Sequence, residues 1–107
     1  MGLRRSLLVA ASGGALLLVA SSAAAAPQTY TVVIEKMKFS PIPALHKGDT
    51  IIWANRDFLR HTATATNHAF DVDLPAGATK KMVLRKTGSF PFFCRYHPGM
   101  RGTLVIK

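Results

Sequence analysis

The residues of this chain that can do the most distinctive chemistry lie near its C-terminus, in the segment CRYHPGM at 94–100. Cys94 is the only cysteine, and His97 and Met100 follow it at intervals of three residues. A thiolate, an imidazole and a thioether this close in sequence can surround one metal ion. Pro98 fixes one backbone angle of the loop, and Gly99 is expected to allow a turn that other residues resist.

A fourth ligand has to come from another part of the chain, and His61, which begins the alternating segment HTATAT, is the leading candidate. One thiolate, two imidazoles and a weak thioether are the ligands of electron-transfer copper sites. Zinc also accepts one cysteine and two histidines, but Met100 would add almost nothing to a zinc site and therefore favours copper. His46 and His68 fall in predicted connecting segments and are interpreted as surface residues.

The N-terminus predicts export. Arg4 and Arg5 precede an apolar run of moderate length and then small residues at 23–26. This is the layout of a removable signal peptide, with an uncleaved membrane anchor as the alternative. We predict a signal peptide over residues 1–26, cleaved near 24–26, and a single domain over 27–107 in the periplasm. The arginine pair partly resembles a twin-arginine signal, so the general secretory route and the twin-arginine route both stay open.

The domain that remains is small and basic. The chain has 14 Lys and Arg residues against 5 Asp and Glu residues, and a formal net charge of +9. Export argues against a nucleic-acid partner, and the cations are scattered along the sequence, so we interpret them as a solvated surface that favours acidic partners. One cysteine cannot form an internal disulfide, and small exported domains commonly depend on disulfides or a metal ion.

Short runs that alternate apolar and polar residues, separated by turn signals, predict an all-β sandwich of about seven to eight strands. The positions expected to point inward are Tyr30, Val32, Ile34, Ile51, Trp53, His61, Ala63, Ala65, Met82, Leu84, Phe90, Phe92, Cys94, Leu104 and Ile106. Met37 is also interpreted as a core residue. Pro91 has no N–H to donate, so it is expected at a sheet edge or at a position without a ladder hydrogen bond.

The segments IEKMKFSP, KGDTIIWANRD, HTATA and GSFPFFCRYHPGMRGTLVIK resemble the cupredoxins, the small blue copper proteins, over nearly all of residues 30–107. The chain as a whole is most similar to the amicyanin and pseudoazurin–plastocyanin branch. Its short C-x2-H-x2-M loop resembles that of amicyanin, because plastocyanin-like members have a longer gap before the methionine. The resemblance implies a Greek-key β-sandwich and one type 1 copper ion held by His61, Cys94, His97 and Met100, with His97 as the electron port. Many family members have Asn after the first histidine ligand. Thr62 stands there in this chain, and its hydroxyl is expected to replace part of the hydrogen bonding that the amide provides.

The ligand set and the resemblance predict a one-electron carrier between redox proteins and not an enzyme, because four engaged ligands leave no open position for a substrate. A copper chaperone or sequestration protein is the alternative. A small copper oxidase or reductase is a third possibility, for which the chain shows no second site. The resemblance suggests an amine dehydrogenase as donor and a c-type cytochrome as acceptor. A monomer without stable membrane insertion is expected.

A docking surface is expected around His97. Phe58, Leu59 and Pro98, with Pro41 or Pro43, are candidates for an apolar patch there. Arg60, Arg95 and Arg101 neighbour the ligands in sequence and either ring this patch or point to solvent. If they ring it, the partner should carry acidic groups, and salt should slow the reaction.

Overall fold

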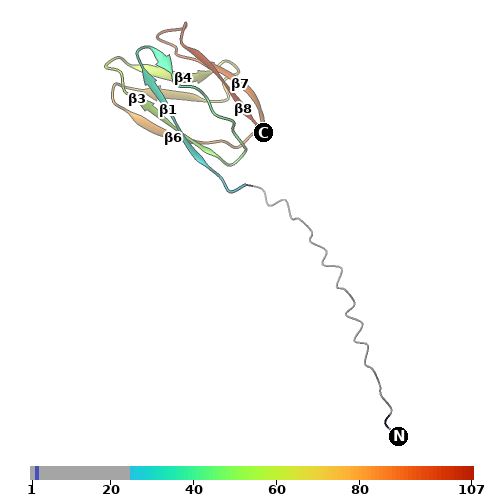
Figure 1. Cartoon of the computed structure of the whole chain (residues 1–107). Helices are drawn as coiled ribbons and strands as arrows, with labels where there is room; N and C mark the ends of the chain where they lie inside the picture. Colours follow the sequence, from blue (N-terminus) through green and yellow to red (C-terminus); the bar gives the residue numbers. More distant parts are fainter. Residues whose placement is uncertain (1, 3–24) are drawn as a thin grey trace.

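The computed structural model describes residue 2 and residues 25–107, so the predicted signal peptide lies almost wholly outside the described residues. The domain is built from eight strands in two sheets (Figure 1). The strands are β1 (Thr29–Glu35), β2 (Lys38–Phe39), β3 (Thr50–Asn55), β4 (His61–Ala65), β5 (Asp71–Leu74), β6 (Thr79–Val83), β7 (Gly88–Phe93) and β8 (Arg101–Ile106). Within the described part of the chain, no helix is long and apolar enough to span a membrane.

The strand order confirms the predicted all-β sandwich. One sheet has the order β2-β1-β3-β6 and the other has the order β5-β4-β7-β8. All pairs are antiparallel except β1 with β3, which run parallel. The chain passes from β5 in the second sheet to β6 in the first and returns to β7. This crossing makes β4 and β7 neighbours although many residues separate them; the candidate ligand His61 begins β4, and Cys94 directly follows β7.

An aromatic cluster fills the space between the sheets. Phe92 lies at its centre, with ring centroids 4.8 Å from Phe39, 5.3 Å from Trp53 and 6.2 Å from Phe70. The predicted inward positions of the strands are buried or pack against this core. The alternation of apolar residues therefore identified the buried face of β1, β3, β7 and β8, because successive side chains of a strand point to opposite sides. It does not do so in β4, which is buried on both faces, Thr62 and Thr64 included.

Two expectations about single residues need correction or refinement. Met37 is not a core residue: its side chain is 39% exposed, because it lies with Lys36 in the left-handed turn between β1 and β2. Pro91 is not on an edge strand, since β7 lies between β4 and β8. Its carbonyl accepts a hydrogen bond from the N–H of Thr66, so its nitrogen faces β4 just beyond the last paired residues of that strand. Pro91 thus occupies a position without a ladder hydrogen bond, which is the second of the two alternatives expected for it.

The turn before β3 is organised by a buried carboxylate. Asp49 is 2% exposed and accepts hydrogen bonds of 2.8 Å from the N–H groups of Gln28 and His46. These two backbone hydrogen bonds lower the pKa of Asp49 below its ordinary value of 3.8, against the opposing effect of burial. Asp49 therefore joins the start of β1 to the entry of β3, provided that its carboxyl group is ionised.

The contribution of Asp49 to stability should depend on pH. Because the folded-state pKa is lowered, ionised Asp49 stabilises the fold above its unfolded pKa, near 3.8, and this contribution is lost as the pH falls through the folded value. We expect Asp49→Asn to lower the free energy of unfolding at pH 7 and to flatten its decline below pH 4. Urea denaturation of the copper-free protein at several pH values measures this. Glu35→Gln, which changes an exposed carboxyl group, is the control. Equal pH profiles for wild type and Asp49→Asn would contradict the assignment.

Candidate metal centre

The register of the second sheet brings two candidate ligands together. β4 and β7 are antiparallel, so the start of β4 lies beside the end of β7. His61 is the first residue of β4, and Cys94 directly follows β7. Both side chains are fully buried, and the His61 Nδ1 atom lies 3.6 Å from the Cys94 Sγ atom. The two groups are thus positioned by strand pairing and need no flexible segment to bring them together.

The loop from 94 to 100 supplies the other two candidates. Its backbone folds through consecutive turns, in which the His97 N–H donates to the Cys94 carbonyl and the Met100 N–H donates to the His97 carbonyl. The Cys94 N–H then donates to the Met100 carbonyl and closes the loop. The spacing of three residues therefore places all three side chains at one end of the sandwich. The expectation for Gly99 was wrong, since only Gly48, Gly77 and Gly88 among the described glycines have positive φ angles.

His61, Cys94 and His97 form a compact donor set. Nitrogen and sulfur atoms of His61, Cys94 and His97 all lie within 4.8 Å of one another. The Nδ1 atom of His97 is buried and has no hydrogen-bond partner among the described residues, so the fold leaves a polar ring nitrogen uncompensated near the thiol. Met100 is 6% exposed in the same loop. One thiol, two imidazoles and a neighbouring thioether match the donor set of a type 1 copper site.

His61 is oriented by a residue that the sequence analysis missed. Its Nε2 atom lies 2.8 Å from the Oδ2 atom of Asp57, while its Nδ1 atom faces Cys94. Burial alone would raise the pKa of Asp57, but the hydrogen bonds from His61 and from the Met37 and Lys36 amides outweigh it and lower the pKa. The available signal was the position of Asp57 four residues before His61, in the segment NRDFLRH.

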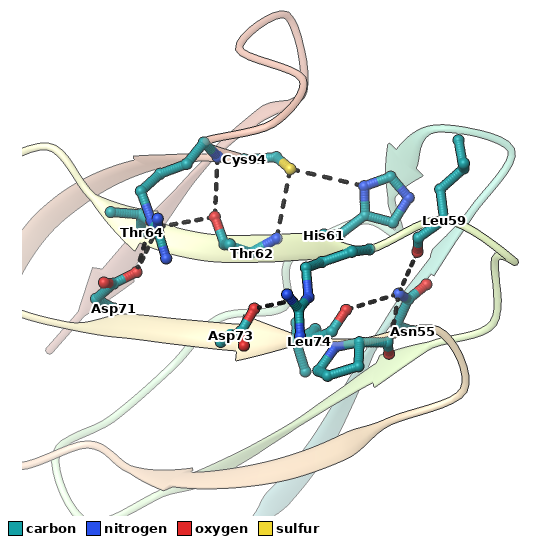
Figure 2. Close-up of polar contacts among 12 residues, drawn as sticks. Asn55, Leu59, His61, Thr62, Thr64, Asp71, Asp73, Leu74 and Cys94 are labelled. Atoms are coloured by element: carbon teal, nitrogen blue, oxygen red, sulfur yellow. Dashed lines mark hydrogen bonds and ion pairs between the residues drawn. The ribbon is translucent and has the colours of Figure 1, made fainter.

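The sulfur of Cys94 has a backbone partner. The N–H of Thr62 donates to Cys94 Sγ at 3.4 Å, and Figure 2 shows this contact beside the contact between Cys94 and His61. A backbone N–H directed at a thiolate disperses its negative charge, and such contacts tune the potential of a metal bound to the sulfur. β4 therefore contributes both a candidate ligand and a hydrogen bond to the other ligand.

Thr62 also connects the two ligand-bearing segments through its side chain. Its hydroxyl oxygen accepts a 2.9 Å hydrogen bond from the Arg95 N–H and lies 2.8 Å from the hydroxyl of Thr64. Thr64 donates to Asp71 at 2.7 Å, and Asp71 also accepts from Arg95 Nε at 3.2 Å. The ring of contacts therefore returns to Arg95, next to Cys94 in sequence. Thr62 thus joins β4 to the ligand loop. Its hydroxyl supplies hydrogen bonding between the two ligand-bearing segments, as expected from the sequence.

Removing the Thr62 hydroxyl should loosen this connection. We expect Thr62→Ala to remove the acceptor of the partly buried Arg95 N–H and to destabilise the copper-free protein by about 0.5–1.5 kcal/mol, the net value of a typical hydrogen bond. Thr62→Ser keeps the hydroxyl and should cost clearly less. Urea denaturation of the three proteins measures the difference. If Ala and Ser were equally destabilising, the lost methyl group and not the hydrogen bond would explain the effect.

The apolar patch expected around His97 includes some of the predicted residues but not all of them. Phe58 is 89% exposed, and Leu59, Tyr96 and Pro98 are also exposed on the two ligand-bearing loops. Pro43 does not belong to this patch, because it lines a groove with Val105 and Lys107, toward the other end of β8. His46 and His68 are exposed, as predicted.

The arginines that neighbour the ligands in sequence, expected either to ring the patch or to point to solvent, contact other groups of the protein. Arg60 Nε lies 3.5 Å from Asp73, and Arg95 Nε lies 3.2 Å from Asp71, with all four side chains about half exposed. Arg101 donates to the Pro98 carbonyl within the ligand loop. The carboxylates of β5 therefore offset much of the positive charge that Arg60 and Arg95 bring to this end of the domain.

Comparison with known proteins agrees with this arrangement. A family model described as a cupredoxin-like domain matches residues 8–106. The chain is similar to amicyanin of Paracoccus versutus (31% identity over 83 residues) and to amicyanin of Paracoccus denitrificans (32% over 88 residues). In both cases 71% of this chain is covered, and it spans 63% of the relative's length.

Solved structures show the same likeness. The crystal structure of Paracoccus versutus amicyanin superposes with a TM-score of 0.63 and 25% identity, covering 82% of this chain and 88% of that one. A copper(I) form of an amicyanin variant has a TM-score of 0.60 and 26% identity, covering 74% and 82% of the two chains. The similarity extends over both sheets and is not limited to the ligand loop, because these coverages exceed the length of either sheet alone.

Proposed function

Because the chain belongs to the cupredoxin-like domain family, we propose that it is an exported one-electron carrier that binds one copper ion through His61, Cys94, His97 and Met100. The observation that carries the proposal is the buried cluster of Cys94 Sγ and two imidazoles within 4.8 Å, with the His97 Nδ1 atom left without a partner. When bound at such a site, copper cycles between its two oxidation states and so accepts and releases one electron.

The protein residues provide a donor set that changes little between oxidation states. His61 begins β4 and Cys94 directly follows the paired strand β7, and the 94–100 loop is closed by its own backbone hydrogen bonds. Soft sulfur suits copper(I), imidazole suits copper(II), and a rigid compromise between them keeps rearrangement small. This rigidity favours electron transfer. Four donors also leave no open position for a substrate, which argues against catalysis.

His97 is the proposed port for electrons. It is the one candidate ligand of the four with intermediate exposure, the other three being buried, and exposed apolar side chains of Phe58, Leu59 and Tyr96 lie on the ligand-bearing loops. An apolar surface permits close approach of another protein without desolvating many charges. We propose that donor and acceptor redox proteins dock here. The family resemblance favours an amine dehydrogenase and a c-type cytochrome in the periplasm.

A chaperone or sequestration role is the competing proposal, and burial distinguishes the two. A copper-handling protein needs ligands that a receiving protein can reach, whereas His61 and Cys94 are 0% exposed. Slow copper release with fast electron self-exchange would support a carrier. Rapid copper transfer to an acceptor chelator, with slow self-exchange, would support handling.

The first test is to express the full chain with its own leader in a Gram-negative host and to purify it from the periplasm. The mass of the product tests cleavage near residues 24–26. After loading with one equivalent of copper(II), we expect an intense blue absorption and a narrow copper hyperfine splitting in the electron paramagnetic resonance spectrum. A pale protein with a wide splitting would mean that Cys94 does not bind the copper, and the carrier proposal would fail.

Salt dependence tests the docking proposal separately. The domain is strongly basic, but the ion pairs of Arg60 and Arg95 reduce its local field, so electron transfer to an acidic cytochrome should slow moderately with rising salt. Asp73→Asn should free Arg60 and steepen this dependence. Stopped-flow rates over a series of salt concentrations measure both effects. Rates that rise with salt would mean that the docking surface repels acidic partners or that apolar contact dominates.

A further inference from the structure

We propose that Asp57 is a positioning residue for His61: its carboxylate holds the imidazole with Nδ1 toward the metal and strengthens that nitrogen as a donor to copper(II). The inference rests on the proposed function, because it assigns a role at the same site. The 2.8 Å contact between Asp57 Oδ2 and His61 Nε2 is the observation from which it starts.

The Asp57–His61 contact is shielded from water. The His61 side chain is 0% exposed and the Asp57 side chain is 13% exposed. Water therefore competes poorly for Nε2, and the carboxylate determines which ring nitrogen carries the proton. With the proton on Nε2, the Nδ1 atom presents its lone pair toward Cys94 Sγ, 3.6 Å away.

The carboxylate is itself held from a third part of the chain. Asp57 Oδ1 accepts from the Lys36 N–H at 2.8 Å, and Oδ2 accepts from the Met37 N–H at 3.1 Å. These two residues form the turn between β1 and β2 and have φ angles of 53° and 60°. Non-glycine residues enter this left-handed region at an energetic cost, so the hydrogen bonds to Asp57 help to keep both amides directed at it.

The loop that carries Asp57 is also fixed at its base. The Asp57 N–H donates to Asn55 Oδ1 at 2.9 Å, and the Asn55 amide group donates to the carbonyls of Leu59 and Leu74. The Arg56 N–H donates to the Ile34 carbonyl on β1. Asp57 therefore has little freedom to leave His61, which is what positioning of a ligand requires.

The charge of the carboxylate gives it a role that a neutral acceptor would lack. An imidazole that donates to a carboxylate is a more basic ligand, and outer partners of this kind typically change metal affinity 10–100-fold. Stronger donation favours copper(II) over copper(I). We expect Asp57→Asn, which keeps an acceptor oxygen but removes the charge, to lower the copper(II)-to-copper(I) affinity ratio about tenfold. For one electron this raises the midpoint potential by about 59 mV.

The test uses the periplasmic product of the full chain and copper alone as the probe. Midpoint potentials are measured for wild type, Asp57→Asn and the control Asp73→Asn. Asp73 lies on β5 opposite Thr62 and loses the same charge without contacting a candidate ligand. A potential shift clearly larger for Asp57→Asn than for Asp73→Asn supports positioning. Equal shifts would show that only long-range charge matters and would overturn the proposal.

Two further measurements separate positioning from general damage to the fold. Met37→Gly added to Asp57→Asn relieves the left-handed turn, so it should recover stability while the potential shift remains. In copper-free wild type, nitrogen-15 NMR should find the His61 proton on Nε2; a proton on Nδ1 overturns the proposal even if the variants do not fold. Because this measurement needs no copper, its failure is distinguishable from the failure of the carrier proposal, which the blue spectrum of wild type tests.

Discussion

Replacing Cys94 with Ser is expected to abolish the blue absorption of the copper-loaded protein and to remove most of the stability that copper provides. The hydroxyl is a poor ligand for copper, and a metal that binds the folded state alone stabilises it by about 4 kcal/mol at a thousandfold excess over its Kd. In a domain of this size each kcal/mol corresponds to about 4–8 °C in Tm. We therefore expect the loaded variant to melt about 15–30 °C below the loaded wild type.

The copper-free proteins are the control for this prediction. Cys94 is 0% exposed, and serine at this position retains His61 Nδ1 and the Thr62 N–H as hydrogen-bonding neighbours, so without copper the two Tm values should differ by only a few degrees. Thermal scans without copper and with free copper at a thousandfold excess over its Kd make the comparison. Equal Tm values for the loaded proteins would show that the thiol is not a ligand and would count against the proposed function.

Replacing Gly102 with Ala is expected to be the most destabilising small substitution near the site. Gly102 on β8 lies opposite Phe92 on β7, and an added Cβ would come within 2.8 Å of the Phe92 Cε1 atom and closer still to Cζ. Phe92 is 1% exposed and is confined by Phe39 and Trp53, so its ring has no free space into which it can turn. Overpacking of this kind costs about 1–3 kcal/mol or more.

Gly99→Ala is the matched control for Gly102→Ala. It lies in the ligand loop, its φ angle is outside the left-handed region, and an added Cβ there meets no atom within 4 Å. Its effect should stay within about 0.5 kcal/mol. Urea denaturation of the copper-free proteins gives both values, and the copper spectra show whether the loop keeps its shape. If the two variants were equally stable, the packing of Phe92 against β8 would be looser than the structure indicates.

Several features of this protein follow from short-range rules that a sequence displays directly. The inward positions of β1, β3, β7 and β8 follow from the two-residue period of a strand. The grouping of Cys94, His97 and Met100 follows from a spacing that a short hydrogen-bonded loop converts into one cluster. Local alternation and spacing act over a few residues, so no knowledge of the distant chain is needed to recognise them.

Other predictions were wrong, and some contacts were missed, because they depend on which distant residues of the chain pack against a given position. Met37 looks like a core residue in sequence, yet its left-handed turn exposes it and directs its amide at Asp57, 20 residues away. Gly99 looks like a conformational glycine, whereas Gly102 is the position at which a side chain would meet the core. Arg60 and Arg95 look like free cations until β5 places carboxylates beside them.

The sequence by itself determined the donor types, the three-residue spacing of the ligand loop and the sandwich that carries it, since these depend on residue identity and local period. Only the tertiary structure decided that Asp57 faces His61 and that Thr62 joins β4 to Arg95. It also placed the Thr62 N–H against the sulfur of Cys94. These contacts link segments up to 33 residues apart, so strand register and burial, and not composition or spacing, bring their atoms within hydrogen-bonding distance.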